Sequence, residues 1–441
     1  MSVSSPMTVL LMPESAYGPT NNCIGIGRVL RQRGHHVVFA AEVSWRGKLA
    51  ALGFDEVLVD LAPPAGDPET QDAGQFWKEF IRDTAQEFRR PTVEQLETFM
   101  APTWQALIDG ARFCEPQLRE IIADVKPDLV VQDNVVCFPA LMTSGVPFVR
   151  IVSCNPLEIR GPDVPPPYSG LGSDDHIAWM EFRSEYERTH RPVWEPFNAW
   201  VQEQGAPPLP DLEFIHTSDL LNLYVYPEMI DYIDRRPMDA TWHRLDSSVR
   251  ETDDTFELPL EMRDRHRGSA LIYLSLGSLG SADVDLMRRL IDVLGRTPHR
   301  YIVSKGPRHD EYELASNMWG AELVPQTRVL PLVDLVITHG GNNTVTEAFH
   351  FGKPMLLLPL FWDQHDNAQR VHETGFGVRL DTYRFTDAQM GEALERLLRD
   401  RLLRLRLDEI GRTLRGRNGV AAAARHIEAA VASNVSRPDA R

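Results

Sequence analysis

Short apolar runs, each followed by a segment with helical spacing, recur in both halves of the chain. In the first half, apolar and β-branched residues fill positions 8–12, 36–41, 56–60, 128–132 and 148–152. In the second half, they fill positions 270–275, 300–303, 334–338 and 354–358. Runs with little polar alternation are typical of strands buried on both faces of a parallel sheet. Each half is therefore predicted to be an α/β domain with a doubly wound sheet built from right-handed strand–helix–strand units.

Between these runs, the spacing of apolar positions predicts helices. One helix is expected over residues 22–33, where Gly34 ends it, and long helical patterns cover residues 71–125. Residues 161–173 are rich in Pro and Gly and predict a surface loop or lid. An Ala-rich pattern over residues 419–432 predicts a helix near the C-terminus.

The chain has 441 residues, which favours two large domains. The polar stretch 250–255 offers few core contacts and is a natural join. We expect an N-terminal domain over residues 1–245, a C-terminal domain over residues 246–418, and a terminal helix and tail over residues 419–441.

Charge and cysteine content exclude several classes of function. The formal net charge is −17, so neither nucleic acid nor an anionic membrane surface is an expected partner. The cysteines show no C-x-x-C spacing, which argues against a zinc ribbon or a disulfide scaffold and suits a reducing cytoplasm; they are Cys23, Cys114, Cys137 and Cys154. The N-terminus lacks a basic region, and no apolar run approaches the ~20 residues that span a bilayer. A cytoplasmic protein is expected.

The turn after residues 334–338 carries the most informative chemistry. His339 is followed by Gly340 and Gly341, and a helix is predicted to begin at Asn342, Asn343 and Thr344. Glycines let a backbone turn bring its N–H groups close to a ligand, and a helix start adds unpaired N–H donors and a positive dipole end. Such a turn suits a diphosphate, although a glycine turn alone is often only structural.

Two further groups extend this pattern. Glu347 lies one helical turn beyond Asn343, about the distance from a diphosphate to its ribose, and a carboxylate there accepts from ribose hydroxyls. Asp363 and Gln364 follow the strand at 354–358, at the sheet edge where open α/β sheets bind ligands, and they suit a sugar. Taken singly, Glu347 could be a solvated helix residue and Asp363 a helix cap.

The ordered set resembles the donor-binding signature of the nucleotide-sugar-dependent glycosyltransferases, which include UDP-glycosyltransferases and bacterial macrolide glycosyltransferases. The matching residues run from His339 to Glu347, then Gly352, Lys353, Pro354 and Pro359, and then residues 363–371. Residues 273–278 match the family's strand and Gly-Ser turn near the phosphates, and residues 324–326 match its base-contacting turn. The resemblance implies a GT-B fold, with two Rossmann-like domains facing a central cleft.

The resemblance also implies a role for each matching residue. Gln326, in the same turn as Val324, would contact the base and Glu347 the ribose, while Asp363 and Gln364 would contact the sugar. The diphosphate would lie against the two glycine turns, at Gly277, Ser278, His339, Gly341, Asn342, Asn343 and Thr344. Leu323 stands where many members have a Trp that stacks on uracil, so UDP and dTDP both stay open as the nucleotide. Apart from the UDP- or dTDP-sugar, no cofactor is implied. No metal is expected either. Asp283 and Asp285 fall in the first turn of a predicted helix, where the helix dipole favours acidic side chains without a metal.

The catalytic base is the clearest departure from the family. Many members carry a His after the first glycine of the N-terminal loop, and here that position is Pro19, which cannot take a proton. Asp133, at the end of the strand at 128–132, is one candidate, although it could merely cap the next helix. Glu14, at the end of the first strand, is another. A third possibility is an acceptor that attacks without a base.

Aromatic residues of the first domain are expected to line the acceptor cleft or to pack in the core. They are Tyr17, Phe76, Trp77, Phe80, Phe99, Trp104 and Tyr168. Aromatics in the cleft would favour a flat or apolar small acceptor.

The leading hypothesis is an inverting transfer of a sugar from a UDP- or dTDP-sugar to a small hydrophobic acceptor, of the natural-product type, forming an O- or C-glycosidic bond. One alternative is a catalytically silent homologue that binds the nucleotide sugar or partners an active transferase, which Pro19 keeps open. Another is a sugar-nucleotide epimerase. Both monomer and dimer stay open as the oligomeric state.

Overall fold

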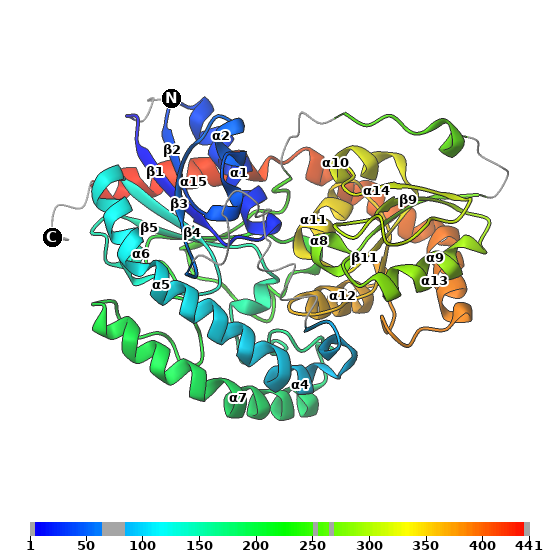
Figure 1. The fold of residues 1–441 in the computed structure, drawn as a ribbon, viewed down its shortest axis with the longest axis horizontal. Helices are drawn as coiled ribbons and strands as arrows, with labels where there is room; N and C mark the ends of the chain where they lie inside the picture. The colour runs from blue at the N-terminus through cyan, green and yellow to red at the C-terminus, as the bar shows by residue number, and fades with distance from the viewer. Residues whose placement is uncertain (1–4, 64–83, 250–254, 264–268, 436–441) are drawn as a thin grey trace.

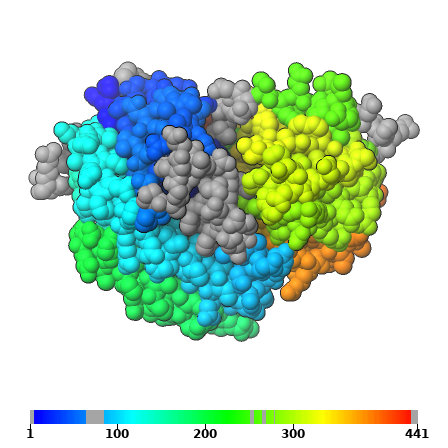
Figure 2. Space-filling view, viewed as in Figure 1, coloured from blue at the N-terminus to red at the C-terminus, as the bar shows by residue number. Residues whose placement is uncertain are grey.

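The computed structural model describes residues 5–63, 84–249, 255–263 and 269–435. Two lobes lie side by side, the N-terminal lobe from blue to green and the C-terminal lobe from light green to orange (Figures 1 and 2). Phe76, Trp77 and Phe80 fall outside the described residues.

The N-terminal lobe is built on a parallel sheet. Its described strands run in the order β3-β2-β1-β4-β5-β6-β7. Their bounds are β1 (Thr8–Pro13), β2 (His36–Glu42), β3 (Asp55–Val59), β4 (Leu129–Asp133), β5 (Phe148–Val152), β6 (Leu221–Tyr224) and β7 (Trp242–Arg244). The central strands are buried on both faces, as their largely apolar sequences predict. In register, Asp133 pairs with both Pro13 and Ile151, so β1, β4 and β5 end together at one edge.

Helices cover this sheet and extend the lobe. They are α1 (Tyr17–Gln32), α2 (Lys48–Ala51), α4 (Thr92–Gln95), α5 (Ala101–Val125), α6 (Pro139–Met142) and α7 (His176–Glu203). The π-helical turn η4 (Leu96–Met100) joins α4 to α5, and the long helices α5 and α7 run along the outside of the lobe (Figure 1). Single 3₁₀ turns of this lobe are η1 (Val43–Trp45), η3 (Glu87–Arg89), η5 (Pro156–Glu158) and η6 (Glu228–Ile230).

The C-terminal lobe has a parallel sheet of its own. Its described strands run in the order β10-β9-β8-β11-β12-β13. They are β8 (Leu271–Ser275), β9 (Arg300–Ser304), β10 (Met318–Ala321), β11 (Leu335–Thr338), β12 (Met355–Leu357) and β13 (Gly377–Arg379). The helices are α8 (Gly277–Gly280), α9 (Val284–Gly295), α10 (Gln326–Val329), α11 (Asn342–His350), α12 (Gln364–Glu373), α13 (Asp387–Arg399) and α14 (Arg401–Arg415), with 3₁₀ turns η7 (Leu260–Met262) and η8 (Leu330–Leu332).

The last helix returns to the first lobe. Helix α15 (Gly419–Val435) lies against α1, and Ala423, Ala424 and Ile427 are buried in the same apolar cluster as β1 and β2 (Figure 1). The chain therefore crosses between the lobes twice, once after β7 and once between α14 and α15.

The predicted fold class, two doubly wound α/β domains, is confirmed by the two sheets. Of the surface loop or lid predicted over residues 161–173, the surface position is wrong for the centre of the segment. Val164 and Tyr168 are buried, and the main-chain N–H groups of Tyr168 and Gly170 donate to the Asp366 carboxylate across the lobe interface. The Pro- and Gly-rich composition predicted an irregular backbone correctly, but this segment is held inside the molecule by Asp366.

Candidate active site

The glycine turn after β11 packs against the turn after β8. Gly340 has a φ of +87°, and a Cβ on Gly341 would lie 2.5 Å from Nε2 of His339. Gly277, with a φ of +72°, would bring its own Cβ to 2.8 Å from the same imidazole. Only residues without side chains let both backbones approach His339 this closely. The structure thus brings together Gly277, His339 and Gly341, which the sequence placed at the diphosphate.

The imidazole of His339 is neutral at pH 7. Burial lowers its pKa to about 4, opposed by a hydrogen bond with the main chain of Ser275. A neutral imidazole offers one N–H donor without a full charge. Together with the N–H groups at the start of α11, the imidazole gives this turn several uncharged hydrogen-bond donors. Such a turn suits an anionic ligand.

Three other residues that the sequence assigned to the nucleotide sugar lie together on α10 and α11. Nε2 of Gln326 donates to Oε2 of Glu347 at 2.6 Å and to Oγ1 of Thr344 at 3.2 Å. Glu347 is half-buried and held in this network, so it is not a freely solvated helix residue. Leu323, which precedes α10, is 66% exposed. Val324, one residue further, is buried in the apolar core of the lobe, and its contact with the base stays a prediction.

Asn342 and Asn343 make contacts that the sequence did not reveal. Nδ2 of Asn342 donates to the main-chain oxygens of Ser153 (2.9 Å) and Val225 (2.7 Å) in the N-terminal lobe. Nδ2 of Asn343 donates to the oxygen of Gly18 at 3.0 Å, and its Oδ1 accepts from Asn22 at 3.1 Å. These amides join the two lobes at the start of α11, and their role toward the diphosphate stays a prediction.

Asp363 and Gln364 are buried beside this interface. Oδ2 of Asp363 accepts from the main-chain N–H of Asn155 at 2.7 Å, and burial raises the pKa of Asp363 to about 7. Oε1 of Gln364 accepts from the main-chain N–H groups of Leu360 (3.1 Å) and Phe361 (3.4 Å). Asp363 occupies the cap position of α12 without a capping hydrogen bond. Their contact with a sugar stays a prediction.

An apolar cavity of about 140 Å³ opens where β1, β4 and β5 end. From the N-terminal lobe it is lined by Glu14, Ala16, Pro19, Phe99, Thr103, Leu107, Asp133, Asn134, Val135, Ser153, Cys154 and Glu158, and from the C-terminal lobe by Leu279, Phe361 and Trp362. Both alternative bases named from the sequence, and the Pro19 that replaces the expected His, therefore surround one cavity.

Asp133 lies in the wall of this cavity and does not cap a helix, because α6 begins only at Pro139. Its Oδ2 accepts from Oγ of Ser153 at 2.6 Å and from the Cys23 thiol at 3.9 Å. Burial raises the pKa of Asp133 to about 8; the Ser153 hydrogen bond opposes this rise, and Glu158 and Glu14 add to it. This carboxyl therefore titrates near physiological pH, as a general base requires.

Glu14 is more firmly engaged. Its Oε1 accepts from the Ser15 hydroxyl at 2.9 Å, and its Oε2 accepts from the Ala16 N–H at 2.7 Å. Both carboxylate oxygens of Glu14 therefore hold the loop that leads into α1. Asp133 uses only Oδ2 in hydrogen bonds to the described residues, which leaves Oδ1 for a ligand.

The predicted aromatics divide between the cavity and its surroundings. Phe99 lines it. Trp104 and Tyr168 form a second layer behind Trp362, with ring centroids 5.2 and 4.8 Å from that indole. Tyr17 packs edge-on against Trp45 at 5.2 Å and is not among the lining residues, so its predicted role in acceptor binding stays a prediction.

Sequence reasoning missed several lining residues. Ser153 and Cys154 follow β5 directly, so the strand-end rule that found Asp133 could also have found them. Trp362 has a φ of +57°, a strained conformation for a residue with a side chain, and only its neighbour Asp363 carried a sequence signal.

The described residues contain no group of three or more His, Cys, Asp or Glu side chains arranged to hold a metal ion. Among the helices of that part of the chain, none is long and apolar enough to cross a membrane.

Comparisons with known proteins agree with this geometry. The family model "UDP-glucoronosyl and UDP-glucosyl transferase" matches residues 254–410. The chain is 25% identical over 419 residues to the NDP-glycosyltransferase YjiC of Bacillus subtilis (strain 168), spanning 94% of this chain and 95% of that relative. It is 26% identical over 437 residues to the oleandomycin glycosyltransferase of Streptomyces antibioticus, spanning 97% and 91%.

Among solved structures, the glycotransferase of kitacinnamycin superposes with a TM-score of 0.70 at 20% identity, over 97% of this chain and 99% of that one. The fold and the site define a glycosyltransferase with the GT-B architecture. The family model over residues 254–410 and these two relatives support a glycosyltransferase of the UDP-glycosyltransferase type, as the motif from His339 to Glu347 indicated.

Proposed function

We propose that this glycosyltransferase transfers a sugar from a UDP- or dTDP-sugar to a small apolar acceptor, with inversion at the anomeric carbon and with Asp133 as the general base. The observation that carries the proposal is the position of Asp133. Its carboxyl lies in the wall of the apolar cavity with a pKa raised to about 8, at the sheet edge that faces the donor turn.

The donor would lie along α11. Its diphosphate would accept from the N–H groups at the start of the helix and from neutral His339, while Glu347, held by Gln326, would accept from the ribose hydroxyls. These preorganised donors would stabilise the charge that develops on the leaving diphosphate. The names of the relatives above, an NDP-glycosyltransferase and an oleandomycin glycosyltransferase, support a nucleotide sugar as donor and a natural product as acceptor.

The acceptor would enter the cavity between Phe99, Phe361 and Trp362. An acceptor hydroxyl beside Asp133 would give its proton to Oδ1, while its oxygen attacks the anomeric carbon from the face opposite the diphosphate. Since the cavity holds about 140 Å³, it would enclose only the reacting ring of a larger molecule. Activated ring carbons would fit the same position, which keeps C-glycosylation within the proposal.

The test is a transfer assay with UDP- and dTDP-sugars and a panel of phenolic and macrolide acceptors, read by mass spectrometry. The proposal expects a product heavier than its acceptor by one sugar, together with release of the matching nucleoside diphosphate. A protein that binds UDP or dTDP but transfers no sugar to any member of the panel would contradict the acceptor class. An epimerised donor would contradict the reaction.

A further inference from the structure

One side of α12 is bonded to the N-terminal lobe from the cap of the helix to its last residue. The residues on this side recur every three or four positions, as neighbours on one helix face do. Each of them makes a hydrogen bond to a residue of the N-terminal lobe; they are Asp363, Asp366, Asn367, Arg370 and Glu373. The first of them, Asp363, is also a residue that the sequence assigned to the sugar.

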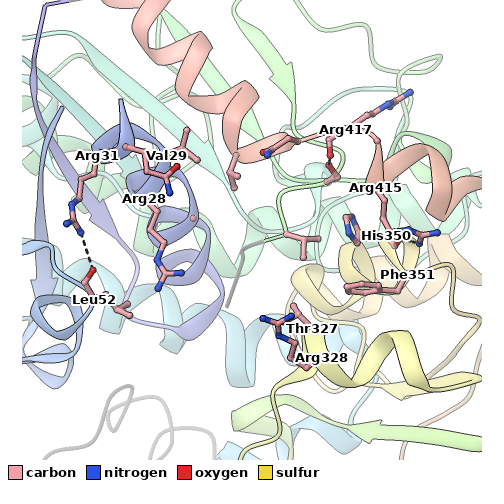
Figure 3. A pocket seen from close by; sticks show the side chains of 17 residues that line it. Arg28, Val29, Arg31, Leu52, Thr327, Arg328, His350, Phe351, Arg415 and Arg417 are labelled. Atoms are coloured by element: carbon pink, nitrogen blue, oxygen red, sulfur yellow. Dashed lines mark hydrogen bonds between the residues drawn. The ribbon is translucent and has the colours of Figure 1, made fainter. Parts of the chain in front are cut away.

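The two lobes are not in direct contact everywhere. Where the chain crosses between them, a cavity of about 1070 Å³ lies between α1 and α10 (Figure 3). Arg28 on α1 and Arg328 on α10 both line this cavity, and Figure 3 shows them on opposite sides of it. Contact between the lobes therefore depends on particular places, and the bonded side of α12 is one of them.

Asn155 supplies the bond to Asp363 from the N-terminal lobe. It follows β5 and is 1% exposed. Its main-chain N–H donates to Oδ2 of Asp363 at 2.7 Å, and its Nδ2 donates to Oδ1 of Asn367 at 2.8 Å. Nδ2 of Asn367 in turn donates to the same Oδ2 of Asp363 at 3.4 Å. These three hydrogen bonds close a ring across the lobe interface.

Asn155 is itself held in one orientation. Its Oδ1 accepts from the main-chain N–H of Leu157 at 2.9 Å, and its Nδ2 also donates to the Tyr226 hydroxyl at 3.1 Å. Because both ends of the amide are bonded, the side chain cannot rotate without leaving buried polar groups unpaired. The bond from Leu157 fixes the start of η5, which carries Glu158 in the wall of the apolar cavity. Asn155 therefore connects Asp363 to the wall of that cavity.

Within the ring, the two oxygens of the Asp363 carboxyl differ. Oδ2 accepts from both Asn155 and Asn367, whereas Oδ1 makes no hydrogen bond to any other residue that the structure describes. A carboxylate oxygen accepts hydrogen bonds from hydroxyl groups, which a hexose carries on several carbons. The ring therefore fixes the direction of Asp363 through one oxygen and leaves the other for a ligand.

We propose that Asn155 is a positioning residue for the donor sugar, which turns Oδ1 of Asp363 toward a hydroxyl of that sugar. The inference rests on the proposed function, because it needs a nucleotide sugar bound along α11. Asn155 belongs to the N-terminal lobe and Asp363 to the C-terminal lobe, so the contact is complete only while the lobes meet at α12. UDP alone needs no such contact, because its ribose is assigned to Glu347.

The test compares a nucleotide with and without its sugar. UDP and UDP-glucose, and dTDP and dTDP-glucose, are titrated into the full-length protein by calorimetry, and the pair that wild type binds more tightly is followed in the variants. Asn155→Asp keeps the size of the side chain and the bond from Leu157, but it places a carboxylate against Oδ1 of Asn367 and opens the ring. We expect the affinity for the nucleotide sugar to fall at least about tenfold, as for the loss of a hydrogen bond to a charged group, and the affinity for the nucleotide alone to stay unchanged.

Two further variants make the result decisive. Ser173→Ala is the matched control, because it removes a side-chain bond from the N-terminal lobe to Glu373 at the far end of α12, and it should leave both affinities unchanged. Asn367→Ala opens the same ring from α12 and replaces Asn155→Asp should that protein not fold. Affinities for the nucleotide sugar and the nucleotide that fall together, or that both stay at their wild-type values, would overturn the positioning role.

Failure of the proposed function gives a different result. A wild-type protein that binds neither UDP nor dTDP would contradict the donor site itself, and the role of Asn155 would fall with it. Normal nucleotide binding in every variant, with the sugar affinity unchanged, would overturn the role of Asn155 alone.

Discussion

Oγ of Ser153 donates a hydrogen bond to Oδ2 of Asp133 at 2.6 Å, and the same hydroxyl accepts from Nδ2 of Asn22 at 2.7 Å. Asn22 also donates to Asn343 at the start of α11 in the other lobe, at 3.1 Å. A chain of hydrogen bonds therefore links the carboxyl in the wall of the apolar cavity to the turn proposed to hold the donor. A shift between the lobes would therefore change the hydrogen bonding of Asp133.

Replacing Ser153 with Ala should move the pH dependence of transfer. The Ser153 hydroxyl lowers the pKa of Asp133 against the effect of burial, so its loss should raise that pKa further above about 8. A base must be deprotonated to act, so kcat/KM should rise with pH through the pKa. In the variant this rise should come at higher pH, with the largest loss near pH 7. A profile whose midpoint stays in place would show that Ser153 does not act on Asp133, and Ser153→Thr, which keeps a hydroxyl, serves as the control.

Replacing Asp363 with Asn should make stability less sensitive to pH. The pKa of Asp363 is raised to about 7 in the folded protein, against about 4 in an unfolded chain. In the folded state the carboxyl therefore stays protonated up to a higher pH. The contribution of Asp363 to the free energy of unfolding is therefore fully present below about pH 4. It is lost as the pH rises from about 4 to 7.

Urea unfolding measures the free energy of unfolding of the variant and of wild type. The difference, Asp363→Asn minus wild type, should be larger at pH 8 than at pH 5 by on the order of 2–4 kcal/mol. Its Oδ1 can still accept from Asn155. Asp219→Asn, at an exposed carboxylate, should show no such gain. An equal difference from wild type at both pH values would argue against a buried, protonated Asp363.

Adding a methyl group at Gly341 should damage the donor turn. The new Cβ would lie 2.5 Å from Nε2 of His339, so the imidazole or the backbone must move. We expect UDP affinity to fall at least tenfold and stability to fall by about 1–3 kcal/mol. Gly391→Ala in α13, where no atom lies within 4 Å, is the matched control, and it should leave UDP binding unchanged and add about 0.5–1 kcal/mol of stability. Wild-type UDP affinity in Gly341→Ala would exclude this turn from the donor site.

Substitution of Gln326 tests how Glu347 is held. Gln326→Ala removes the hydrogen bond of 2.6 Å to Oε2 of Glu347, and bonds to charged groups contribute about 1.5–3 kcal/mol, so UDP should bind roughly tenfold more weakly. Gln326→Glu should be worse, because it places a second carboxylate beside the first. Calorimetry with UDP measures both, and a Gln326→Glu protein that binds like wild type would contradict the ribose contact.

The sequence predicted the two sheets and the glycine turn around His339 because both depend on local pattern. Unbroken apolar runs mark buried strands, and the glycines around His339 mark a close turn. The short strands β6, β7, β10 and β13 were not predicted, since glycine or polar residues interrupt their apolar sequences. Asn342 and Asn343 were predicted only as ligand contacts. Their bonds to the other lobe depend on how two distant segments meet, which no local pattern records.

The apolar cavity where β1, β4 and β5 end was predicted only in part, because strand ends can be found from local pattern and most of its other lining cannot. Asp133 and Glu14 were found because they end strands, and both line the cavity. Trp362 was missed, since its position depends on a strained backbone between β12 and α12. The central segment of 161–173 was predicted to be exposed, because its composition does not reveal that Asp366 binds its N–H groups from the other lobe.

If Asp133 takes the acceptor's proton, the transfer rate of Asp133→Asn at saturating donor must fall. Asn keeps the size of the side chain and can still accept from Ser153, but it cannot take a proton at neutral pH. We expect a kcat at least ~10²-fold below wild type with UDP affinity unchanged. A variant that turns over at the wild-type rate would contradict it.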